Sequence, residues 1–403
     1  MDAKIKPADV WLNKNSLIFK MPLLLIALGA VSLFYWFSFY STVPSRAMYG
    51  YLFGFAEALS LVLGCMIFVL IQHVTRAGWS VVIRRIPEAF MATSPLLILF
   101  FLPIAFFSHE IFPWLHEKHV DKILAKKLPY LNENFFLIRS FIYLFIWGTI
   151  GIWFYRLSVK QDKNGELKIT RILQAISAPC IIVFGLSLTF ASFDWFMSLQ
   201  PHWYSTMFGV YFFAGSFLSS LALITISAIF IRKSQALTTV ITKEHYHDLG
   251  KLLFGFTVFW AYIGFSQFML YWYAAIPEEA EFYIHRMHHG FGKISWALPI
   301  IHFFIPFFAL MPRTLKKIPL ILALNCLWLI LVHIIDLYWL ILPTYRDAHG
   351  HALELPNGIL IDFLALFGIN SIFIGVFIFI LSRRCLLPIK DPRLPESLAF
   401  ENF

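Results

Sequence analysis

Ten apolar stretches, each long enough to cross a bilayer as a helix, dominate this chain of 403 residues. A transmembrane helix needs about 20 predominantly apolar residues. The stretches are Met21–Tyr40, Tyr51–Val74, Phe90–Phe107, Phe135–Tyr155, Ile172–Met197, Thr206–Ile231, Leu252–Tyr273, Ile294–Leu310, Pro319–Leu342 and Ile359–Leu381. They predict an all-α integral membrane protein with about ten transmembrane helices. Prolines inside several of them are compatible with this prediction, because neighbouring helices satisfy the freed backbone groups.

The composition excludes a water-soluble protein. Hydrophobic residues make up 59% of the chain and charged residues only 14%, whereas soluble domains carry about 25% charged residues. The net charge of +9 does not point to nucleic acid. Basic residues in a membrane protein report orientation and lipid contact, and the sequence has no nucleic-acid motif. We therefore expect lipid partners and no nucleic-acid partner.

Neither the cysteines nor the N-terminus indicates a further class of protein. The four cysteines lie far apart and none has Cys-x-x-Cys spacing, which disfavours a disulfide framework, an iron–sulfur cluster and c-type haem. Residues 1–20 are polar, and no small-residue cleavage site follows the first apolar stretch. We read that stretch as a retained first helix.

The distribution of basic residues predicts the orientation. With ten helices, 23 of the 32 lysines and arginines fall on the side that holds both termini. Cytoplasmic loops carry this excess of lysine and arginine in membrane proteins. We therefore expect a multi-pass protein with both termini in the cytoplasm.

Two outer segments are richer in polar groups than short turns need. The first, residues 108–134, balances four acidic residues against four lysines, and residues 116–127 resemble a short surface helix. Such a long loop is usually functional or a docking element, although an interfacial helix on the lipid headgroups fits equally well. The second, Ala274–Lys293, has a polar cluster that is either a contact surface for other subunits or a solvated surface: Glu278, Glu279, Glu281, His285, His288 and His289.

Ionisable residues within the apolar stretches are candidates for function, because a charge is costly in lipid. Those inside the stretches are Glu57, His73, Arg139, Asp194, His302, His333, Asp336 and Asp362, and Glu88 lies just before the third stretch. His333 and Asp336 are three residues apart and share one helix face. We predict that Glu57, Asp194 and Asp336, assisted by His333 and His302, form one polar cavity in the outer half of the membrane. Polar residues also join helices through hydrogen bonds, which is the simpler interpretation of Ser60, Ser187 and Asn325.

Three further predictions each concern a pair of residues. His73 and Glu88 lie near the inner helix ends and are candidates for proton entry from the cytoplasm. Tyr262 and Arg139 are assigned with the outer residues to a quinone or proton path. His302 and His333 also lie at similar depth, a geometry that can hold a b-type haem. A multi-haem membrane subunit would normally offer more such pairs, so we predict that this chain itself binds no haem and no metal.

Three motifs resemble one known family. The sequence reads DWFMSLQPHWYSTMFG over residues 194–209 and GKLLFGFTVFWAYIGFSQ over residues 250–267, and His333, Asp336, Tyr338 and Trp339 follow later. These segments, and the ten-helix count, are similar to the polysulfide-reductase-type (NrfD-like) membrane subunits of bacterial alternative complex III. The similarity is greatest to the second of the two such subunits, ActF.

The resemblance implies an architecture and a function. The family fold is two four-helix bundles with one flanking helix at each end. It predicts a first helix in residues 1–45, bundles in residues 46–200 and 201–345, and a tenth helix with a cytoplasmic tail in residues 346–403. The complex oxidises quinol in the bacterial cytoplasmic membrane and passes electrons to cytochrome c or another acceptor. The chain would supply a quinone site, for menaquinone or ubiquinone, or a proton path. Its partners would be a sister NrfD-like subunit and periplasmic iron–sulfur and multi-haem cytochrome c subunits, which would hold the redox centres.

A second function fits the same intramembrane carboxylates. They could line the path of an ion channel or a proton-coupled transporter. Transporters built from repeats usually show broken helices at matched positions near the midplane. The sequence has prolines but no such matched pair.

Overall fold

The computed structural model describes residues 10–13, 16–115, 122–234, 236–347 and 349–401. The predicted fold class is confirmed: across these residues, ten helical spans are long and apolar enough to cross a membrane. The first five spans are α1 (Leu17–Tyr40), α2 (Pro44–Val74), α3 with α4 (Val81–Met91, Pro95–Phe106), α6 (Glu133–Asn164) and α7 (Leu167–Trp195). The other five are α8 (Phe208–Lys233), α9 (Lys243–Ala274), α11 to α12 (Phe291–Leu298, Ile305–Leu310), α14 (Pro319–Ile341) and α15 (Ile359–Ser382). Within α11 to α12, η5 (Pro299–Phe304) is a stretch of π-helix.

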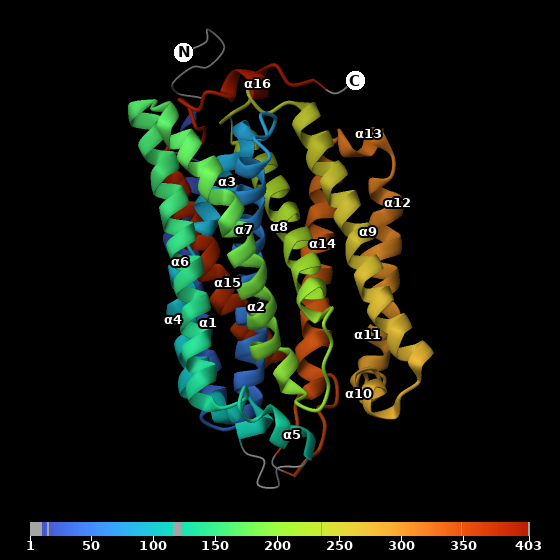
Figure 1. The fold of residues 1–403 in the computed structure, drawn as a ribbon. Helices are drawn as coiled ribbons and strands as arrows, with labels where there is room; N and C mark the ends of the chain where they lie inside the picture. Colours follow the sequence, from blue (N-terminus) through green and yellow to red (C-terminus); the bar gives the residue numbers. More distant parts are fainter. Residues whose placement is uncertain (1–9, 14–15, 116–121, 235, 348, 402–403) are drawn as a thin grey trace.

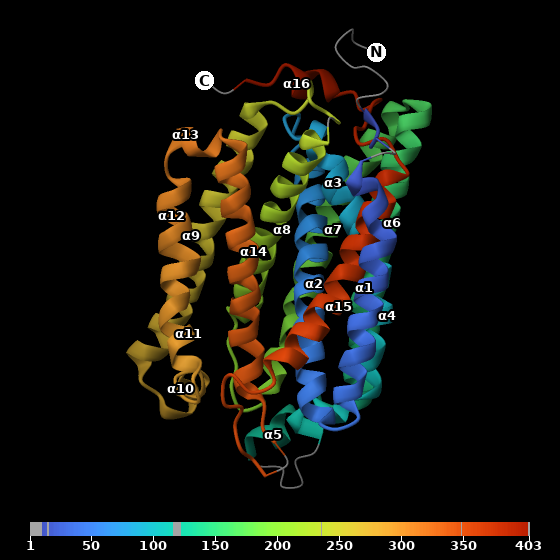
Figure 2. The same cartoon turned by 180° about the vertical axis from the view of Figure 1, so that it is seen from behind.

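The spans lie roughly side by side (Figure 1), and α2 is the most enclosed of them. α2 contacts α3, α7, α8 and α15. The first and last spans, α1 and α15, pack along each other, and both contact α2 (Figure 2). Helices α9, α11 and α12 lie on the side of α8 and α14 that faces away from α2 (Figures 1 and 2). An enclosed α2 explains why Glu57, halfway along it, is buried.

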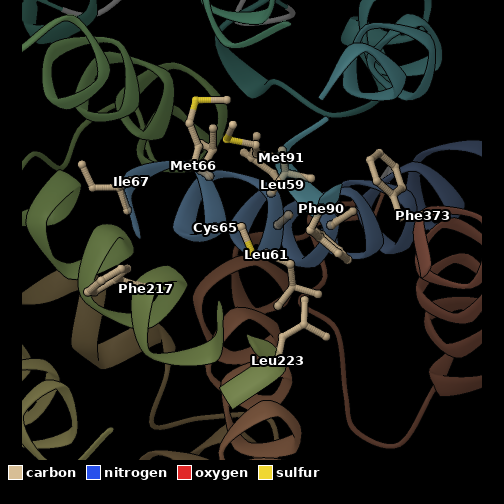
Figure 3. Close-up of a cluster of buried hydrophobic side chains, with 14 of the residues drawn as sticks. Leu59, Leu61, Cys65, Met66, Ile67, Phe90, Met91, Phe217, Leu223 and Phe373 are labelled. Atoms are coloured by element: carbon tan, nitrogen blue, oxygen red, sulfur yellow. The ribbon is translucent and has the colours of Figure 1, made fainter. Parts of the chain in front are cut away.

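The two halves of the chain meet where α2 crosses α8. A Cβ atom added at Gly64 would lie 2.1 Å from Ser220 Oγ and 2.5 Å from the Ser216 carbonyl oxygen, so only glycine allows this approach. Ser216 Oγ donates to Ser60 Oγ over 3.1 Å. Figure 3 shows apolar side chains of α2, α3, α8 and α15 gathered around Cys65. This tight seam joins the two halves through close contact rather than through charge.

The chain termini lie at one end of the molecule. Residues 10–13 and the short helix α16 (Leu394–Leu398) are both at the upper end in Figure 1, and Leu386 N–H donates to the Val10 carbonyl over 2.8 Å. We call this the terminal end. The opposite end carries α5 (Lys122–Lys127), α10 (Pro277–His285) and η6 (Leu342–Thr344).

The long loop of residues 108–134 is partly helical. It contains η2 (Ser108–Glu110), η3 (Pro113–Leu115) and α5, which covers the end of the predicted helix 116–127; residues 116–121 lie outside the described residues. Trp114 packs against Phe136 of α6, and Lys127 donates to the Pro201 carbonyl. The loop thus folds back onto neighbouring segments. Its predicted role in docking stays a prediction.

Candidate functional site

Polar side chains from both halves of the chain meet beside α8. Glu57 of α2 and His333 of α14 approach within 3.8 Å (Oε2 to Nε2), and both are almost fully buried. Asp336, one helical turn from His333, is 2% exposed. Gly215 of α8 makes room for them, because a Cβ there would lie 2.8 Å from His333 Cε1 and 3.7 Å from Asp336 Oδ2. The predicted His333–Asp336 face therefore points at α8.

The Asp336 carboxylate accepts two hydrogen bonds from aromatic side chains. The Tyr211 hydroxyl of α8 donates to Oδ1. The Trp260 indole of α9 donates to Oδ2 over 3.1 Å. Among the described residues, Asp336 therefore has no cationic hydrogen-bond partner, unlike the other buried carboxylates described below. An unpaired carboxylate can accept a proton without breaking an ion pair.

His302 completes this group from the π-helical stretch η5. Its ring packs against Trp260 at a tilt of 32°, with ring centroids 3.8 Å apart. Short π-helical segments occur frequently at functional sites. We call Glu57, Tyr211, Trp260, His302, His333 and Asp336 the central polar cluster.

Several atoms of this cluster have no hydrogen-bond partner among the described residues. They are both carboxylate oxygens of Glu57 and both ring nitrogens of His302 and of His333. Buried polar atoms in proteins are almost always bonded to protein or to water. Six such atoms in one place can bond water or exchange protons.

An apolar pocket of about 660 Å³ lies beside the central polar cluster and shares Tyr211 and Trp260 with it. Its walls come from α8, α9, α10, α11, η5 and α14. Its aromatic lining residues are Tyr211, Trp260, Tyr262, Phe265, Phe268, Tyr283, Trp296, Phe303, Phe304 and Trp339. Tyr262 and Trp296 are 64% and 72% exposed, so the pocket opens sideways, where lipid tails would surround the helix bundle. Tyr262 is at this rim, not beside the buried carboxylates.

The volume and lining of the pocket suit a flat ring with an apolar tail. Ligand pockets usually measure about 300–1,000 Å³ and combine apolar walls with a few polar groups. Here the lining residues with polar groups include Tyr211, Trp260, Gln267, Tyr283 and Ser295, and the first two also donate hydrogen bonds to Asp336. A ligand bound there would lie one side chain away from a carboxylate.

Asp194 lies in a different polar group from the one predicted. Arg139 of α6 donates to both of its carboxylate oxygens, over 2.9 and 2.8 Å, and Tyr143 donates over 3.0 Å. The Arg139 guanidinium also lies over the Tyr130 ring at 3.9 Å. Asp194 is thus held in an ion pair between α6 and α7. The predicted part of Asp194 and Arg139 in a quinone or proton path stays a prediction.

The inner-side candidates also have partners. Glu88 binds Arg84 over 3.0 Å, Arg85 over 3.1 Å and the Ser158 hydroxyl over 2.7 Å. His73 packs beside Phe154. The two arginines reach further, to Asp391 and Asp162. This network ties α3 and α6 to the C-terminal segment near the terminal end, and a role in proton entry is untested.

The sequence did not single out Tyr211 or Arg46. Tyr211 lies in a long apolar helix, where a tyrosine is unremarkable without its partner. Arg46 donates to both oxygens of Asp362, over 2.6 and 2.5 Å, from the N-terminal turn of α2. Opposite charges at the ends of two predicted helices were the one available signal for the Arg46–Asp362 pair.

In comparisons with known proteins, no family model and no curated relative matches the chain.

Proposed function

We propose that this chain is a membrane subunit of a quinol-oxidising respiratory complex, and that it binds a quinone in the apolar pocket. The observation that carries the proposal is that Tyr211 and Trp260 both line the pocket and hold Asp336. The motifs at residues 194–209 and 250–267 support the same reading through their likeness to alternative complex III. Electrons would pass to iron–sulfur and haem groups in partner subunits, including a sister membrane subunit.

Quinol oxidation releases two protons with two electrons, so a site for it needs a proton acceptor close to the quinol hydroxyl. In the proposed arrangement, the ring lies between the aromatic walls and the tail leaves past Tyr262 and Trp296. The quinol hydroxyl donates to Tyr211, whose own proton passes to Asp336. Beyond Asp336, the next ionisable groups are Glu57 and His333. They would receive protons through bound water.

A substitution in the pocket tests this proposal. A Cβ at Gly264 would already lie 3.2 Å from the Tyr211 ring, and Gly264 lines the pocket. Gly264→Leu should fill the pocket and reduce quinone affinity by at least tenfold. Quenching of tryptophan fluorescence by a short-tailed quinone, in the full chain in lipid nanodiscs, measures it.

Gly255→Leu is the matched control, because Gly255 is on the same helix, has open space around it and does not line the pocket. It should leave quinone affinity unchanged. Equal quenching in both variants and the parent chain would place the quinone elsewhere.

The orientation is part of the proposal. The basic residues favour a cytoplasmic terminal end, which would put the pocket in the outer half of the membrane. A reporter active only outside the cytoplasm should therefore be active when fused after Gln200 and silent after Lys233 or Lys390. Activity after Lys390 would contradict the proposed orientation.

The alternative function, an ion or proton-coupled transporter, finds less support. A transport path must continue from the central polar cluster toward the terminal end. In that direction α2 and α8 are in direct contact at Gly64, Ser216 and Ser220. Uptake of ions by the chain alone in liposomes would favour the transporter.

A further inference from the structure

Arg286 is a buried cation that has no acidic partner among the described residues. It follows α10 and is 1% exposed. Its guanidinium donates to the carbonyls of Phe282, Trp339 and Leu340, over 2.7, 3.0 and 2.6 Å, and to Gln200 Oε1 over 3.0 Å. All four acceptors are neutral. The guanidinium therefore has hydrogen-bond partners, but none of them carries a negative charge.

The other buried arginines among the described residues differ from Arg286 in their partners. Each of them forms an ion pair with a carboxylate: Arg46 with Asp362, Arg84 with Asp391, Arg85 with Asp162 and Arg139 with Asp194. An uncompensated charge in an apolar interior costs several kcal/mol. Burial lowers the pKa of Arg286 to about 9, so the side chain remains protonated at neutral pH. A cation kept at such a cost calls for a compensating anion.

Arg286 stands directly behind one wall of the apolar pocket. Its neighbour Met287 lines the pocket, as does Trp339, whose ring centroid is 5.1 Å from the guanidinium carbon. Ser295, also in the wall, donates to the Arg286 carbonyl over 2.6 Å and accepts from the Trp339 indole over 2.7 Å. Between these apolar walls the charge is weakly screened and acts on whatever occupies the pocket.

Resting on the proposed function, we infer that Arg286 makes the pocket selective for quinone headgroups that carry a negative charge. During quinol oxidation this group is the quinolate. The quinol O–H bond breaks, the proton passes through Tyr211 to Asp336, and the negative charge moves from the carboxylate to the quinol oxygen. Arg286 is the fixed positive charge that stabilises this anion until electrons leave for the partner subunits. It acts as a positioning charge and does not touch the proton.

The test compares two ligands that differ in one ionisable group. An alkylated hydroxynaphthoquinone is anionic at neutral pH, and its O-methyl ether has the same ring and tail but no charge. The full chain, in nanodiscs of zwitterionic lipid, should bind the acid at least tenfold more tightly than the ether, which corresponds to about 1.4 kcal/mol. Arg286→Gln should remove this preference, and Arg286→Lys should retain part of it.

Each outcome separates the inference from the function on which it rests. Equal binding of both ligands to the parent chain overturns the role of Arg286 and leaves the quinone pocket standing. Failure of both ligands to bind, or equally tight binding by Gly264→Leu, overturns the proposed function itself. The comparison in the parent chain decides the matter even if Arg286→Gln fails to fold.

Discussion

In the proposed quinol-oxidising complex, replacing Asp336 by asparagine is expected to slow quinol-linked electron transfer by about a hundredfold to ten-thousandfold, the usual cost of losing a positioned acid or base. Asparagine preserves the size of the side chain and an oxygen that accepts one of the two hydrogen bonds from Tyr211 and Trp260. It cannot take up the proton. Quinol:acceptor turnover and proton release, measured together, should fall in parallel.

Two companion variants make this result specific. Glu57→Gln, further along the proposed path, should slow proton release, with a smaller effect on turnover. Asp194→Asn alters a carboxylate that is held by Arg139, and it should affect stability more than rate. If all three variants assemble normally and keep both activities, the central polar cluster is structural and the chemistry belongs to the proposed sister subunit.

Replacing Arg139 by alanine is expected to cost about 3–5 kcal/mol of stability, because it leaves the buried carboxylate of Asp194 without its cation. Asp194 is 0% exposed and receives both charged hydrogen bonds from Arg139. The measurement is thermal unfolding in detergent, together with the yield of folded protein in the membrane. A large drop in both is the expected result.

A double replacement provides the control. Arg139→Leu with Asp194→Leu removes both charges, and buried ion pairs replaced by apolar side chains are often as stable as the original. The double variant should therefore recover most of the stability lost in Arg139→Ala. Unchanged unfolding in Arg139→Ala alone would show that the pair is not essential to the α6–α7 contact.

The sequence predicted the ten spans because about 20 consecutive apolar residues have few alternatives to a transmembrane helix. It placed the start of the third span too late, at Phe90, whereas α3 begins at Val81. The reason lies in Arg84, Arg85 and Glu88, which read as a charged cytoplasmic segment. In the structure they pair with one another and with Asp391 and Asp162, and so they fit inside a helix.

The sequence identified most of the ionisable residues of the candidate site, but it did not predict which of them contact one another. Spacing shows which residues share one helix face, as for His333 and Asp336. It does not show how neighbouring helices are rotated, so it could not place Asp194 against Arg139 rather than Glu57. In the sequence, Arg286 is one of several polar residues in an outer segment. Its position beside Trp339 follows from the fold and cannot be predicted from spacing along the chain.

The docking surfaces predicted at residues 108–134 and Ala274–Lys293 stay predictions. Glu281 and His285 in the second segment approach within 3.4 Å, and His285 also contacts Gln200. Glu281 and His285 of this outer segment therefore already have partners within the chain. Cross-linking from Lys122 in membranes would show whether partner subunits or only lipids lie against the first segment.

The proposed quinone site is the apolar pocket beside Asp336. The most direct measurement is photolabelling of the full chain in nanodiscs with an azidoquinone, followed by peptide mapping with and without excess quinone. We predict competed labelling within residues 258–268 of α9 and 295–304 of α11 and η5, the segments that line the pocket. Labelling confined to other helices, or labelling that excess quinone does not reduce, would contradict this proposal.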